Sequence, residues 1–178
     1  MAIKKIKYKN HQFLSSSRRG FVLIEIIISV AIISIAFGSL LSVGASVFNL
    51  SRLIRQTTTA RSMATEELEA VRAWRDSTSW DVDGLGVVST GETNAHYFFV
   101  DDTNTPNKWN INSGTETVEG FTRSVVFDRV SRDPTSGDIQ SIYNPANDDP
   151  DTRKATVTIA WEVQSTQSLQ IVTYFTNW

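Results

Sequence analysis

The feature that most constrains this chain is an apolar run of thirty residues, Phe21 to Leu50, in which Glu25 is the only charged residue. As a helix, the run would be about 45 Å long, which exceeds the roughly 30 Å hydrocarbon core of a bilayer. Its most apolar part, from Phe21 to Leu41, has the length of one tilted membrane span. A soluble protein would need a far larger body than this chain provides to bury such a helix. The run therefore predicts a membrane-spanning helix.

Charge is distributed unevenly on the two sides of this run. Residues 1–20 contain six Lys and Arg and no Asp or Glu, whereas the remaining 158 residues contain eleven basic and nineteen acidic residues. Basic residues beside a span stay in the cytoplasm. We therefore expect a cytoplasmic N-terminus and a C-terminal body that is translocated to the other side of the membrane. The acidic body lacks the clustered positive face that phosphate contacts need, which argues against a nucleic-acid-binding protein.

The basic segment and the apolar run also fit a secretory signal peptide. Ser34-Ile35-Ala36 would then be the small-residue cleavage site. Against this interpretation, the apolar run continues past Ala36 to Leu50 and contains the acid Glu25.

A second kind of processing is indicated by the segment Arg18-Arg19-Gly20-Phe21-Val22-Leu23-Ile24-Glu25. It resembles the cleavage and methylation motif of type IV prepilins and of the pseudopilins of type II secretion. The resemblance implies that a membrane peptidase cuts between Gly20 and Phe21 and that Phe21 is then N-methylated. It also implies that Glu25 acts in assembly. Val22 stands where the family often has Thr.

Glu25 also indicates a function on physical grounds. A carboxylate deep in a bilayer costs roughly 2.5–3.5 kcal/mol, so such an acid needs a partner. Cleavage after Gly20 would create a cationic amine at Phe21, four residues away, at the helix end where anions are favoured. The family model pairs this acid with the N-terminal amine of a neighbouring subunit in a filament core. The alternative is a Glu near the interface that reaches water.

The helical pattern continues beyond Leu50. No Pro occurs before Pro106, so we expect one helix over about 21–76, with an apolar first half and an amphipathic second half. Residues 60–76 are similar to the corresponding part of minor pilins of the PilV type. The expected inward stripe consists of Leu53, Ile54, Thr57, Ala60, Ala64, Leu68, Val71 and Trp74.

The remaining residues, 77–178, change to the alternating pattern of strands. Strands are predicted at 86–89, 96–100, 121–130, 155–163 and 169–175, the last two forming a hairpin. Long loops are predicted over 101–120 and 131–154.

The predicted fold class is α+β, with a long N-terminal helix packed on a C-terminal antiparallel β-sheet domain, the ladle of the pilin family. The expected organisation is a basic leader (1–20), a membrane or filament-core half of the helix (21–50), an amphipathic half (51–76) and a strand-rich globular head (77–178).

Catalytic and cofactor motifs are missing from the sequence. There is no Cys, no phosphate-binding loop, no Gly-x-Ser-x-Gly and no metal-ligand spacing of His and Cys. We therefore expect no enzyme and no cofactor. Asp148, Asp149 and Asp151 form a cluster of oxygen ligands that suits Ca²⁺, as in some pseudopilins by resemblance. The alternative is a solvated acidic loop.

The resemblance implies a structural subunit, a minor pilin of a type IV pilus or a related filament. The implied partners are the prepilin peptidase, other pilin subunits through the N-terminal helix, an inner-membrane assembly platform, and membrane lipid before assembly. The implied location is the inner membrane, as a single-pass precursor, and then the pilus or cell surface. Two alternatives stay open: a pseudopilin of a type II secretion system, and a single-pass membrane protein with an extracytoplasmic binding domain.

Overall fold

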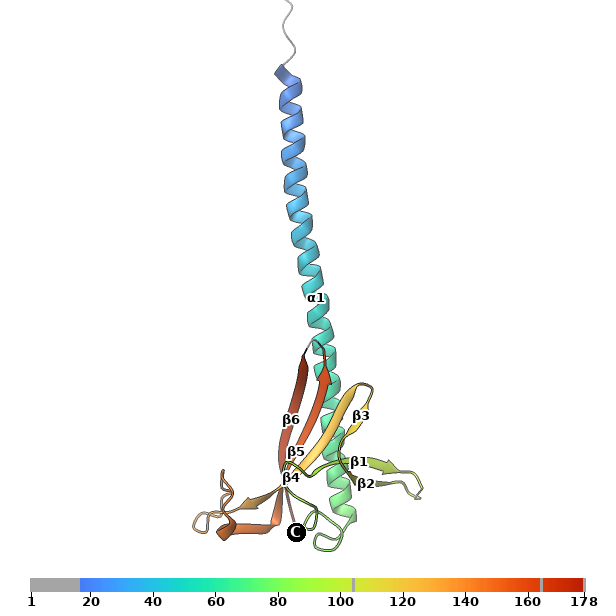
Figure 1. Cartoon of the computed structure of the whole chain (residues 1–178), viewed down its shortest axis with the longest axis vertical. Helices are drawn as coiled ribbons and strands as arrows, with labels where there is room; N and C mark the ends of the chain where they lie inside the picture. The colour runs from blue at the N-terminus through green and yellow to red at the C-terminus, as the bar shows by residue number, and fades with distance from the viewer. Residues whose placement is uncertain (1–16, 104, 164, 178) are drawn as a thin grey trace, which may run out of the picture. The chain divides into compact units, whose positions relative to one another are not determined.

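The computed structural model describes residues 17–103, 105–163 and 165–177. Residues 1–16 of the predicted leader therefore lie outside the described residues. Within this part of the chain the elements are, in order, α1 (Ser17–Ser77), β1 (Ala95–Asp101), β2 (Lys108–Ser113), β3 (Glu116–Val118), β4 (Phe121–Ser131), the short 3₁₀ helix η1 (Pro145–Asn147), β5 (Asp148–Glu162) and β6 (Thr166–Thr176) (Figure 1). The chain divides into two compact units between Arg52 and Leu53.

The first unit contains the apolar part of α1. From Phe21 to Leu50, every residue is exposed except Gly44, which is intermediate. Two serine hydroxyls of this part donate hydrogen bonds to the backbone of their own helix. Ser34 donates to the carbonyl of Val30 at 2.7 Å, and Ser39 to that of Ile35 at 2.9 Å. These hydroxyl protons are thus satisfied without water, as an apolar environment requires.

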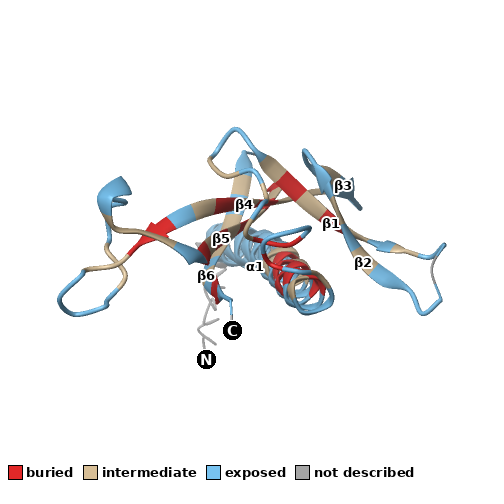
Figure 2. Cartoon of the chain, turned by 90° about the horizontal axis from the view of Figure 1, so that it is seen from below, coloured by how far each residue is buried: buried red, intermediate tan, exposed pale blue. Residues whose placement is uncertain are grey.

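The second unit is a sheet with the C-terminal part of α1 packed on one face, which confirms the α+β class. The sheet has six strands in the order β2-β1-β4-β5-β6, with β3 pairing β4, and every pairing is antiparallel. Figure 2 shows the buried residues of α1 on the side that faces the sheet. The predicted hairpin is confirmed, since β5 and β6 pair along eleven residues of each strand.

Aromatic rings join the helix to the sheet. Trp74 of α1 packs edge-on against Phe98 of β1, with ring centroids 5.6 Å apart, and Phe98 packs against Phe127 of β4 at 6.4 Å. Phe98 and Phe127 are fully buried. Edge-to-face pairs of this kind stabilise a core beyond their buried area.

The predicted inward stripe of α1 is correct from Ala60 onward and wrong before it. Ala60, Ala64 and Val71 are fully buried, but Leu53 is 42% exposed and Ile54 57% exposed. The periodicity of the apolar residues continues through this region, and it cannot indicate where the sheet begins to cover the helix.

Three predictions in the head are also wrong. Residues 86–89 form turns rather than a strand, β2 and β3 lie within the predicted loop 101–120, and β5 begins at Asp148 rather than at 155. The reason for the missed β2 is its exposure: its sequence, KWNINS, is rich in Asn, and no residue of it is buried. Such a strand lacks the apolar alternation on which the prediction relied.

The turn at Gly86 is closed against Trp80. The Gly86 N–H donates to the Trp80 carbonyl at 2.9 Å, and the Gly86 carbonyl accepts from Arg153 Nη2 at 2.8 Å. A Cβ at position 86 would lie 2.6 Å from both the Trp80 carbonyl oxygen and Trp80 Cδ1. The indole is itself held, because its Nε1 donates to the Pro150 carbonyl at 3.1 Å. Gly86 is therefore required by close packing.

We predict that Gly86→Ala lowers the free energy of unfolding by about 1–3 kcal/mol, the usual cost of overpacking. Chemical denaturation of the full chain in detergent, followed by near-UV circular dichroism, measures the change. Gly38→Ala is the control, since a Cβ there meets nothing within 4 Å. Equal stability of the two variants would contradict the packing argument.

Candidate functional site

The residues predicted for processing and assembly all lie in the first turns of α1. Gly20 falls within the helix, Phe21 is 79% exposed, and Glu25 is exposed one turn further on. Side chains four residues apart lie on the same face of a helix. None of the side chains that the structure describes, from residue 21 onward, forms a hydrogen bond or ion pair with Glu25. Among these residues, Glu25 is thus an acid without a partner on an apolar helix.

The surface around Glu25 is long and apolar enough to cross a membrane. The most apolar window of 18 residues has a mean hydropathy of 2.6, and none of it is buried. The large side chains remain mostly exposed, as with Ile35 at 71% and Phe48 at 79%. Soluble monomers rarely expose continuous apolar surface on this scale. This surface needs cover from outside the described chain.

A second polar feature, which the sequence did not indicate, joins the helix to the sheet at Glu67. This carboxylate is fully buried on α1. Its Oε1 accepts from the Phe98 N–H at 2.8 Å, and its Oε2 lies 3.2 Å from Arg123 Nη1. The second contact is an ion pair without hydrogen-bond geometry. A side chain of the helix therefore binds the backbone of β1 directly.

The position of this contact follows from a fork in the sheet. β1 pairs with β4 only through Ala95 and His96, after which β3 takes the place beside β4, with Glu116 opposite Arg123. Beyond the fork, the Phe98 N–H is bound by Glu67, and the Phe98 carbonyl accepts from Arg123 Nη2 at 3.0 Å. Two side chains thus complete the hydrogen bonds of a buried backbone, as buried amides require.

Arg123 is shared among three carboxylates at this fork. Besides Glu67, its Nη2 lies 2.5 Å from Glu116 Oε2, and its Nη1 lies 3.7 Å from Glu66 Oε1. Burial raises the pKa of Glu67 above its ordinary value of 4.5; the Phe98 N–H and the Arg123 charge oppose this rise. The nearby carboxylates of Glu116 and Glu66 raise the pKa of Glu67 further, so the net shift is upward.

The periodicity contains one signal for Glu67. Glu67 follows Ala64 by three residues and precedes Val71 by four, so it occupies the buried face of α1. A charge at such a position predicts a buried partner. The identity of that partner could not be predicted, because it is a backbone N–H of a strand whose pairing ends at the fork.

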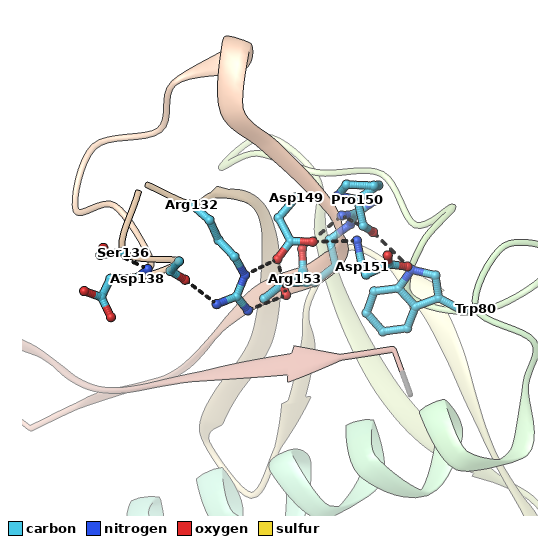
Figure 3. A network of polar contacts seen from close by, with 10 residues as sticks. Trp80, Arg132, Ser136, Asp138, Asp149, Pro150, Asp151 and Arg153 are labelled. Atoms are coloured by element: carbon cyan, nitrogen blue, oxygen red, sulfur yellow. Dashed lines mark hydrogen bonds and ion pairs between the residues drawn. The ribbon is translucent and has the colours of Figure 1, made fainter. Parts of the chain in front are cut away.

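The carboxylates proposed for calcium have different side-chain partners, and Figure 3 shows the contact of Asp149 with Arg132. Asp149 Oδ2 accepts from Arg132 Nε at 2.5 Å and from the Thr152 hydroxyl at 2.7 Å. Asp148 accepts from the Tyr143 hydroxyl at 2.9 Å, and Asp151 from the Asn177 amide at 3.0 Å. The described part of the chain contains no group of three or more carboxylates or histidines that could hold a metal ion. Whether calcium binds stays a prediction.

Asp149 is instead the centre of a loop anchor. Burial alone would raise its pKa, but hydrogen bonds from Thr152, Arg132 and the Asp151 N–H hold the pKa below its ordinary value. Arg132 also donates to the Gly137 carbonyl at 3.1 Å, so the same guanidinium holds the loop before β5. This arrangement stabilises the ionised carboxylate and needs no metal.

His96 is buried in the head. Its Nε2 lies 3.2 Å from the Ser89 hydroxyl, and its ring packs against Phe127 at 5.8 Å. Burial lowers the pKa of His96, because desolvation disfavours the imidazolium. We interpret it as a neutral core residue.

No family model, no curated protein and no solved structure matches this chain. The fold defines an α+β protein that carries, near its N-terminus, one helix able to cross a membrane by length and composition.

We predict a specific pH dependence for the contact at Glu67. Because its pKa is raised in the folded state, the folded protein binds this proton more tightly than the unfolded chain, and stability from this group is lost as the pH rises. The free energy of unfolding of the wild type minus that of Glu67→Gln should therefore increase as the pH falls through the folded pKa, and level off below about 4.5.

Chemical denaturation of both proteins in detergent, over a series of pH values, measures this difference and cancels contributions from other groups. Glu69→Gln, at a carboxylate that is 59% exposed and pairs with Arg72, provides the baseline for removing a charge from this helix. A difference that is flat, or that increases with rising pH, would contradict the assignment.

Proposed function

We propose that this chain is a structural subunit of a type IV pilus or a related filament. In this proposal a membrane peptidase cuts between Gly20 and Phe21 and methylates Phe21, and the subunit then assembles through its N-terminal helix. The observation that carries the proposal is the apolar surface of α1, which no described residue covers, with one acid that no described side chain pairs, four residues beyond the proposed new terminus.

The exposed apolar surface of α1 supports a subunit that moves from lipid into a bundle of helices. Before assembly, lipid would surround residues 21–50, since their length and hydropathy suit a bilayer. In a filament, the same side chains would pack against the helices of neighbouring subunits. Helix association within lipid relies on packing and polar contacts rather than on the hydrophobic effect, so a lone acid can decide the partner and the register.

The chemistry of Glu25 supports the pairing with a neighbouring terminus. Cleavage would leave an amine at Phe21, and N-methylation keeps that amine positively charged. In its own chain, this cation would lie at the positive end of the helix dipole, where it is disfavoured. The carboxylate of a neighbouring subunit would stabilise it, and the amine would neutralise the acid in return.

The head supports a structural rather than a catalytic role. The buried carboxylate of Glu67 and the half-buried carboxylate of Asp149 are bound by Arg123, by Arg132 and by backbone N–H groups. These contacts fix the sheet to the helix and a loop to β5. In the proposed filament, the head would face outward, and the prepilin peptidase and an inner-membrane assembly platform would act on the helix.

We predict that Glu25→Ala inserts into the membrane at least as well as the wild type but enters filaments poorly. The expected loss is large, because removing one partner of a buried ion pair costs about 3–5 kcal/mol. Membrane fractionation measures insertion, and immunoblotting of sheared surface filaments against the cell-bound pool measures assembly.

Glu69→Ala is the matched control, since it removes an exposed Glu from the same helix beyond the apolar run. It should assemble like the wild type. Normal incorporation of Glu25→Ala would contradict the pairing role. Processed subunits that stay in the periplasm without surface filaments would favour a pseudopilin.

A further inference from the structure

The sheet ends at β6 in a free edge. β6 follows β5 in the strand order, and no strand of the described residues pairs with its other side. Its eleven residues, TQSLQIVTYFT, contain no charged residue, no Pro and no Gly, and the β5–β6 pairing continues without a register shift. Natural sheets protect edge strands with charges, prolines, bulges or short length. β6 has none of these protections.

The register shows which backbone groups of β6 are free. The Asn177 N–H donates to the Asp151 carbonyl at 2.8 Å, and the pairing continues with Phe175 opposite Arg153 and Ile171 opposite Val157. In an antiparallel pair, alternate residues exchange both hydrogen bonds with the partner. The odd-numbered residues of β6 therefore bond to β5. Its even-numbered residues direct their N–H and C=O groups away from the sheet.

The opposite edge of the sheet is protected. β2 has six residues and begins with Lys108. The Ile111 N–H faces away from β1 by the same reasoning. It is not available to donate to an added strand, because it already donates to Asn110 Oδ1 at 2.9 Å. The two edges thus differ in charge and in the availability of backbone N–H groups to an added strand.

The even-numbered residues of β6 also carry apolar surface. Val172 is 52% exposed and Tyr174 46% exposed, on the face of the sheet away from α1. The odd-numbered residues of β6 face the helix, where Phe175 is buried under the Arg75 guanidinium, 5.6 Å from the ring centroid. The free edge and the exposed apolar pair therefore coincide.

We propose that the free edge of β6 pairs antiparallel with β6 of a second copy of this chain, centred on Val172. In this register, Val172 faces its own copy, Gln170 faces Tyr174, and Ser168 faces Thr176. Val172 meets an apolar partner, Gln170 lies against the ring and hydroxyl of Tyr174, and Ser168 meets a polar partner. No charge of the strand is buried, because the strand has none. The contact closes on a two-fold axis, so it joins two heads and does not propagate.

β6 of a second copy fits the free edge of β6 better than other strands do. A charged partner strand would bring its charges against Val172 and Tyr174, where β6 offers no counter-charge. The β2 edge of a second copy would bring Lys108 and an N–H that Asn110 already occupies. β6 itself matches in length, in polarity and in unpaired backbone groups. The inference concerns the head alone and does not depend on the proposed function.

The absence of Cys from the chain makes the test direct. Residues that exchange both bonds across an antiparallel pair have Cα atoms about 5.5 Å apart, which lies within the range for a disulfide. Under mild oxidation of the full-length protein in detergent micelles, Val172→Cys should form a covalent dimer. Val100→Cys on β1 is 47% exposed and serves as the exposure-matched control; it should form little dimer. Association through α1 would affect both variants equally.

Two further measurements test the register. A mixture of Gln170→Cys and Tyr174→Cys proteins should give several times more dimer than either protein alone. Adding Val172→Pro to both should abolish that gain while the fold stays intact, because the Val172 N–H takes no part in the β5 ladder. Circular dichroism verifies the fold. Equal dimer from Val172→Cys and Val100→Cys, or no gain on mixing, would overturn the proposal.

Discussion

A single helix in this protein has to satisfy two different environments. From Ala60 onward, α1 is covered by the sheet of its own chain, and its buried residues pack with Phe98 and Phe127. From Phe21 to Leu50, the described residues offer no such cover, and the apolar side chains stay exposed. Exposed apolar surface of this extent is stable only against lipid or against other apolar surfaces. In the proposed function, membrane insertion and assembly are two uses of the same residues.

The head shows how the covered half of the helix is fixed in place. Packing alone would let a helix slide on a sheet, because apolar contacts have little direction. The hydrogen bond from the Phe98 N–H to Glu67 gives that direction, and the ion pair with Arg123 extends it to β4. A buried charge stabilises a fold weakly, but it specifies an arrangement in some proteins. We interpret the contact at Glu67 as specifying the register of helix and sheet.

Much of this architecture could be predicted from the sequence. The long helix, β1, β4 and the β5–β6 hairpin follow from periodicity, since each is apolar on one face. β2 and β3 could not be predicted, because their residues are exposed and polar. Gly20, Phe21 and Glu25 were proposed from local sequence alone and their roles stay predictions, whereas the buried Glu67 was missed. Its function depends on Phe98 and Arg123, far away in the chain, which only the fold brings together.

The most direct test of the account is the mass and N-terminal sequence of the mature protein isolated from cell membranes. We expect a chain that begins with N-methylated Phe21, which would supply the amine that the account pairs with Glu25. A chain that still begins at Met1 would leave that acid without its partner and would favour a single-pass membrane protein. A chain that begins downstream of Ala36 would indicate a cleaved secretory signal. Either of these two results would contradict assembly through the N-terminal helix.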